Sequence, residues 1–186
     1  MKLGKYSIYF FICFFFNLNQ SFSETISNIK IEDLKDLPST YEEIEEFVEE
    51  ENVDITETIH QIAHDFSDFA KHRNIEISIV GKNLIQKHIN KDLAIILFTN
   101  LIKNAIVHAT LNSIVKISIE GEKINIENIA ETGKLDEQQL FSRFYKVNTR
   151  KNSTGLGLAI AKAIAEKYDL KLTYAYQNKH IFTVSF

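Results

Sequence analysis

Three polar side chains recur at helical spacing in the apolar stretch of residues 96–110. Asn100, Asn104 and His108 are four residues apart, so on a helix they lie on one face, each a turn beyond the last. The neighbouring leucines have the spacing of a buried stripe: Leu93, Leu97 and Leu101. Two amides and an imidazole beside such a stripe are either satisfied polar groups of an ordinary helix or functional groups.

A second chemical signal is the glycine pair in Ser153–Ala161, where Gly155 and Gly157 precede an apolar helical pattern. Glycines that open a helix let backbone N–H groups approach a ligand, and the helix N-terminus adds partial positive charge, as phosphate binding requires. Upstream lie an aromatic and basic run, residues 140–146, and then Arg150 and Lys151. This order predicts a lid segment, residues 140–154, that closes over a polyphosphate.

Three stretches together resemble the ATP-binding domain of sensor histidine kinases, within the GHKL superfamily. Residues 100–108 are similar to the asparagine motif of that family, residues 140–146 to its phenylalanine motif, and residues 154–160 to its second glycine motif. The motifs stand in the order of the family, and the resemblance covers about residues 54–186.

The resemblance implies ATP and Mg²⁺ as cofactors. It implies that Asn104 holds Mg²⁺ between phosphate oxygens with support from Asn100, and that His108 helps to neutralise phosphate charge. The implied catalytic residues are Asn100, Arg143 and Lys146. The implied nucleotide contacts are Asn104, His108, Asn128, Arg150, Lys151, Thr154, Gly155, Leu156, Gly157 and Leu158.

Two positions at the end of one expected strand depart from the family. Asn128 stands where the family carries an aspartate that accepts a hydrogen bond from the adenine amino group, and Ala130 replaces the first glycine that follows. An asparagine carbonyl still accepts that bond, but it is neutral, so we expect a weaker contact.

The chain before residue 54 differs from the rest. Residues 1–23 carry an apolar run, residues 6–16, which is shorter than a spanning helix and is followed by a passable signal-peptidase site. They are either a secretory signal or a short membrane anchor, the latter with the ATP domain in the cytoplasm. Residues 24–53 hold eleven acidic and two basic residues and form an acidic linker with a short helix, capped by Thr40 and Glu43.

Residues 54–186 show the patterns of a folded α/β domain. Strands are expected at 75–79, 114–120, 123–128, 171–176 and 180–186, with a hairpin turn at Gly121 and Glu122, and helices at 54–73, 91–109, 136–146 and 156–168. Asp54 and Glu57 can cap the first helix. The pattern predicts a two-layer α/β sandwich with helices on one face of a mixed sheet, and the resemblance implies the same Bergerat-type fold.

We therefore expect a kinase domain that binds Mg-ATP and transfers the γ-phosphate to a histidine on a partner or missing domain, with a response regulator downstream. His64 and Asp65 resemble an acceptor motif, but the chain leaves no room there for a dimerisation hairpin, so a surface histidine is favoured. The alternative is a truncated or non-catalytic protein that sequesters a partner when nucleotide binds. A net charge of −4 argues against nucleic-acid binding, and the single Cys13 excludes a thiolate metal site.

Overall fold

The computed structural model describes residues 44, 47, 49–146 and 155–186. Helices and strands follow in the order β1 (Glu51–Asp54), α4 (Ile55–Asp65), α5 (Ser67–Lys71), β2 (Glu76–Val80), β3 (Gln86–Ile89), α6 (Lys91–His108), β4 (Ile114–Glu120), β5 (Lys123–Asn128), α7 (Gly157–Lys167), β6 (Lys171–Tyr176) and β7 (His180–Ser185). The bounds of β4, β5 and β6 are those predicted from sequence alternation.

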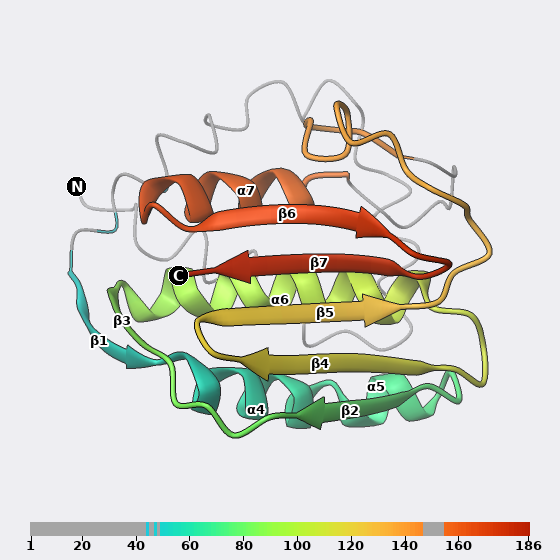
Figure 1. Cartoon of the computed structure of the whole chain (residues 1–186), viewed down its shortest axis with the longest axis horizontal. Helices are drawn as coiled ribbons and strands as arrows, with labels where there is room; N and C mark the ends of the chain where they lie inside the picture. The colour runs from blue at the N-terminus through green and yellow to red at the C-terminus, as the bar shows by residue number, and fades with distance from the viewer. Residues whose placement is uncertain (1–43, 45–46, 48, 147–154) are drawn as a thin grey trace, which may run out of the picture. The chain divides into compact units, whose positions relative to one another are not determined.

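A mixed five-stranded sheet forms one layer, with strand order β2-β4-β5-β7-β6. β2 pairs with β4 in parallel, and the other pairs are antiparallel, including β4 and β5 joined by the predicted turn at Gly121. Figure 1 shows α4, α6 and α7 along one face of this sheet. Alternate sheet residues such as Ile117, Ile126 and Phe182 are buried beneath those helices. The two-layer sandwich is therefore confirmed.

Helix α6 is the central helix, and its leucine stripe is confirmed. Leu93, Leu97 and Leu101 are at most 1% exposed, as is Phe98. The helix begins where the side chain of Asn90 accepts a hydrogen bond from the Leu93 N–H over 3.1 Å, an N-cap that satisfies a backbone donor in the first turn.

The first predicted helix, residues 54–73, is broken in two, which corrects that prediction. Asp54 caps α4 as expected, because its carboxylate accepts from the Glu57 N–H over 2.9 Å. The chain then turns at Phe66, where ψ is −3°, and restarts as the short helix α5. Phe66 is buried at this turn, whereas Phe69 is 41% exposed, so the apolar stripe ends there.

Strands β1 and β3 were not predicted. They pair antiparallel as a separate two-stranded sheet, and β1 begins before the predicted boundary at residue 54. Both strands are four residues long and mostly polar, too short for alternation to stand out. Ile44 and Phe47, which lie in the predicted linker, pack on the core. Residues 1–23 and the predicted cap at Thr40 and Glu43 lie outside the described residues.

The predicted helix over residues 136–146 is absent from the structure, which has successive turns there instead. The N–H of Leu140 donates to the Asp136 carbonyl, and the N–H of Ser142 to that of Gln139. At Phe144 the backbone takes a φ of +62°, which a right-handed helix excludes, and its N–H donates to the carbonyl of Gly155. This long-range bond replaces the helical one.

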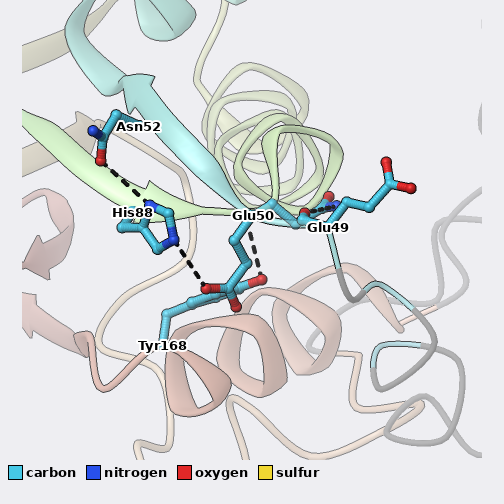
Figure 2. Close-up of polar contacts among 6 residues, drawn as sticks. Glu49, Glu50, Asn52, His88 and Tyr168 are labelled. Carbon is cyan, nitrogen blue, oxygen red and sulfur yellow. Dashed lines mark hydrogen bonds and ion pairs between the residues drawn. The ribbon is translucent and has the colours of Figure 1, made fainter.

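The segment before β1 is joined to α6 and α7. The Glu49 carbonyl accepts from the Asn90 side-chain amide over 2.7 Å, and the backbone N–H of Asn90 donates to the Tyr168 hydroxyl over 3.1 Å. Figure 2 shows the Glu50 carboxylate between Tyr168 and His88, whose Nε2 lies 3.7 Å from it. Burial raises the pKa of Tyr168, so its hydroxyl keeps its proton. Glu49 and Glu50, just before β1, are thus bonded to the start of α6 and the end of α7.

None of the helices in the described part of the chain is long and apolar enough to cross a membrane.

Candidate functional site

The three polar residues of α6 that the sequence singles out lie along the border of its buried stripe. Asn100, Asn104 and His108 are each half-buried, one turn apart, while the adjacent Leu101 and Ala105 have no exposed surface. Lys103 lies on the same stretch, and burial lowers its pKa. The helix therefore presents two amides, an imidazole and a lysine along a partly open border.

The start of α7 abuts this border. Gly157 is the first residue of α7, and a Cβ built on it would lie 3.0 Å from the Asn100 side-chain oxygen. Glycine allows this close approach, because a Cβ here would push the Asn100 side-chain oxygen away by a few tenths of an ångström. Within the described residues no side chain caps the α7 N-terminus, and its first turn has no acidic residue. Its N–H groups therefore suit an anion.

The two ends of the predicted lid segment are held together. Gly155 has a φ of +74°, and a Cβ on it would come within 2.8 Å of the Phe144 backbone. The Phe144 N–H donates to the Gly155 carbonyl over 3.0 Å. Leu140, 3% exposed, anchors the upstream end in the core. Both ends of the lid segment are therefore held by the fold: the upstream end by the buried Leu140, and the downstream end by the contact between Gly155 and Phe144.

The predicted cations of the lid segment fall into two groups. Arg143 and Lys146 are both exposed beside the Phe144–Gly155 contact. Arg150, Lys151 and Thr154 lie outside the described residues. Leu156 and Leu158, next to the glycines, are half-buried.

Asn128 is the last residue of β5 and is 3% exposed. Its side-chain nitrogen has no hydrogen-bond partner among the residues that the structure describes. The carbonyl of the next residue, Ile129, accepts from the Thr110 N–H over 2.8 Å, just beyond the C-terminus of α6. Asn128 therefore lies near the end of α6 that carries His108, and its side-chain nitrogen is buried without a partner in the described part of the chain.

A buried network that sequence analysis missed holds the loop after β5. The hydroxyl of Tyr174 accepts from the Leu135 N–H over 3.1 Å and lies 2.8 Å from His180 Nδ1. His180 Nε2 lies 3.0 Å from the Thr132 carbonyl, which can only accept, so Nε2 carries the proton. Nδ1 then accepts from Tyr174. Burial lowers the pKa of His180 and raises that of Tyr174, which keeps this arrangement neutral.

His180 faces Asn128 directly across the β5–β7 pairing, so the network also fixes the strand end that carries Asn128. The sequence did contain a signal for it. His180 is the first residue of a strand whose alternate residues are buried, and a histidine at such a position needs polar partners.

These residues fit a nucleotide with Mg²⁺. In the described ranges no three or more His, Cys, Asp or Glu side chains cluster as a metal site. Mg²⁺ needs no such cluster, since it keeps several waters and binds through few protein oxygens together with substrate phosphates. Asn104 offers one amide oxygen for the cation. The side-chain nitrogen of Asn128, unpaired among the described residues, offers a separate polar contact for the nucleotide.

Comparison with known proteins agrees with this geometry. Residues 89–186, just over half of the chain, match the family described as histidine kinase-, DNA gyrase B-, and HSP90-like ATPase. The heme sensor protein HssS of Staphylococcus epidermidis is 35% identical over 91 residues, 47% of this chain and 20% of that protein. HssS of Staphylococcus saprophyticus is 37% identical over 99 residues, 48% and 21% of the two chains. The chain thus spans about a fifth of these relatives.

Solved histidine kinases share the fold. The Acinetobacter baumannii histidine kinase AdeS superimposes with a TM-score of 0.63 at 23% identity, over 84% of this chain and 75% of that one. The catalytic domain of histidine kinase ThkA does so with a TM-score of 0.62 at 18% identity, over 74% and 94%. The chain belongs to the family of histidine kinase-, DNA gyrase B- and HSP90-like ATPases.

Proposed function

We propose that this chain binds ATP with Mg²⁺ and serves as the phosphate-donating domain of a two-component histidine kinase. The observation that carries the proposal is the approach of Gly157 to Asn100, with a Cβ on Gly157 only 3.0 Å from the Asn100 oxygen. It brings the α7 N-terminus, which no side chain caps among the described residues and which suits phosphates, beside the α6 amides, which suit a hydrated divalent cation.

In this proposal each group of residues has one task. The N–H groups at Gly155 and Gly157 bind phosphate oxygens, and the Asn104 oxygen takes a position on Mg²⁺ with support from Asn100. His108 adds positive charge near the phosphates. Asn128 contacts the base. Bound Mg²⁺ would screen the negative charge of the phosphates.

The lid cations complete the phosphate site. Arg143 and Lys146 are exposed next to the contact between Phe144 and Gly155. They can therefore reach a γ-phosphate without a movement of the core. Arg150 and Lys151 are proposed to do the same from the middle of the lid segment. Their charge stabilises the oxygens of the transferred group in the transition state.

The transfer itself needs an acceptor imidazole from another domain. The imidazole nitrogen bonds to the γ-phosphorus, and the bond from that phosphorus to the β–γ bridging oxygen breaks. ADP leaves with the bridging oxygen, and the imidazole loses a proton to solvent. His64 is an exposed residue in the last turn of α4, with Nδ1 3.6 Å from the Asp65 carboxylate. We expect no self-transfer to it.

The placement of the chain in the cell follows from the substrate. Because the phosphate donor is ATP, we propose that residues 54–186 act in the cytoplasm. Residues 1–23 would attach the chain to a membrane, with the part of residues 24–53 that precedes β1 as the connecting segment.

Titration calorimetry with ATP tests the binding step. We expect binding in Mg²⁺, loss of binding in EDTA, and at least about tenfold weaker binding for Asn104→Asp, because a carboxylate adds negative charge beside the triphosphate. Asn83→Asp is the matched control, since Asn83 is exposed in the loop between β2 and β3 and its backbone carbonyl, not its side chain, accepts from the Thr56 hydroxyl. Equal affinity with and without Mg²⁺, or equal effects of both variants, would refute the metal assignment.

Labelled ATP tests the transfer. Incubation with γ-labelled ATP, Mg²⁺ and a dimerisation hairpin from a full-length histidine kinase should give acid-labile phosphate on the hairpin only. Label on this chain that disappears in His64→Gln would show that the acceptor is internal. Tight ATP binding without transfer to any hairpin would favour a nucleotide-dependent binding protein.

A further inference from the structure

The buried amide of Asn128 has an unused donor. The side chain is 3% exposed, and its nitrogen has no hydrogen-bond partner in the described ranges. Leaving a buried donor unpaired is unfavourable, so such a group in a folded protein calls for an explanation, and a ligand is one.

The two described neighbours of Asn128, His180 and Ile129, already use their polar groups in other hydrogen bonds. His180, opposite it across the β5–β7 pairing, uses Nδ1 for the Tyr174 hydroxyl and Nε2 for the Thr132 carbonyl. The Ile129 carbonyl already accepts from the Thr110 N–H. The position is also rigid, because β7 holds one side of the strand end and the end of α6 holds the other. A ligand that enters here meets a carboxamide on a backbone that is held in place.

A carboxamide and a carboxylate differ in the hydrogen-bonding groups of a base that they can pair with. An ionised carboxylate only accepts hydrogen bonds, whereas an asparagine both donates and accepts. Adenine presents an amino donor at C6 next to the N1 acceptor. A 6-oxopurine presents the opposite pair, an oxygen acceptor at C6 next to an N1–H donor. Rotation of the amide by half a turn, which its terminal torsion allows, matches it to either edge.

We infer that Asn128 makes the proposed nucleotide site accept 6-oxopurine nucleoside triphosphates as well as ATP. This inference rests on the proposed function, since it assumes that the base lies against Asn128. With adenine, the side-chain oxygen accepts from the amino group and the nitrogen donates to N1. With a 6-oxopurine, the side-chain nitrogen donates to the oxygen on C6, and the side-chain oxygen accepts from N1–H. A carboxylate at this position would face the oxygen on C6 with no donor.

Inosine triphosphate is the probe, because its base presents the 6-oxopurine edge without the additional amino group of guanine. Calorimetry on the full chain in Mg²⁺ should give a Kd for inosine triphosphate within about tenfold of that for ATP. In Asn128→Asp the ratio of the two constants should rise at least about tenfold, since an unpaired buried group weakens binding by roughly that factor or more. Asn83→Asp, which adds the same charge at an exposed loop, should leave the ratio unchanged.

Each outcome decides a different point. Wild-type chain that binds ATP but binds inosine triphosphate more than about tenfold weaker overturns this inference and leaves the proposed function standing. An unchanged ratio in Asn128→Asp also overturns it, with folding of the variant checked by circular dichroism. If that variant does not fold, the wild-type ratio decides alone. Failure of the wild-type chain to bind either nucleotide refutes the proposed function and this inference together.

Discussion

Replacing Asn90 with alanine should destabilise the domain through two separable losses. The Asn90 side-chain oxygen caps α6 by accepting from the Leu93 N–H over 3.1 Å, and its nitrogen donates to the Glu49 carbonyl over 2.7 Å. Loss of an N-cap costs about 0.5–2 kcal/mol. Loss of the second hydrogen bond costs about 0.5–1.5 kcal/mol. The free energy of unfolding should therefore fall by about 2 kcal/mol in Asn90→Ala.

Asn90→Asp separates the two losses. Aspartate keeps an acceptor for the Leu93 N–H, and its negative charge suits the N-terminus of a helix, but it cannot donate to the Glu49 carbonyl. We expect a smaller loss of stability, about 1 kcal/mol, together with faster amide hydrogen exchange in Glu51–Val53. The exposed Asn83→Ala is the matched control and should change stability by less than about 0.5 kcal/mol.

Urea unfolding followed by far-UV circular dichroism measures these differences, and hydrogen exchange with mass spectrometry reports on β1. A loss below about 0.5 kcal/mol in Asn90→Ala would show that neither bond contributes. Unchanged hydrogen exchange in Glu51–Val53 for Asn90→Asp would show that the hydrogen bond from Asn90 to the Glu49 carbonyl does not stabilise β1.

Three further predictions use other parts of the structure. Burial lowers the pKa of His180 below its ordinary value of about 6.5, so the unfolded chain binds the extra proton first and unfolding free energy should fall as pH drops from about 7.5 to about 5.5. His180→Gln should flatten that dependence in urea titrations. Gly155→Ala should lower the melting temperature and weaken ATP binding, because a φ of +74° costs alanine about 1–3 kcal/mol. Gly133→Ala, where a Cβ meets nothing within 4 Å, should do neither. Deleting residues 1–53 should leave a less stable domain than deleting residues 1–43, because Val53 is buried and β1 pairs with β3.

The sequence alone determined the elements whose pattern is local. The leucine stripe of α6 repeats once in each turn, and apolar and polar residues alternate along β4 and β5 and most of β6. The bounds of these elements could therefore be read from neighbouring residues. The order of the motifs predicted that Asn100 and the glycine pair share a site, and the structure places Gly157 beside Asn100. The roles of these residues toward ATP stay predictions.

Tertiary structure decided everything that depends on partners far apart in the chain. Asn90 bonds with Tyr168, 78 residues away, and Thr132 with His180, 48 residues away, so no local pattern could reveal either network. The turns in residues 136–146 have the same cause, because the N–H of Phe144 bonds to Gly155 rather than to the preceding turn. A helical spacing of apolar residues shows only which side chains a segment would bury if it formed a helix. The hydrogen bonds available from the rest of the fold decide which conformation the segment takes.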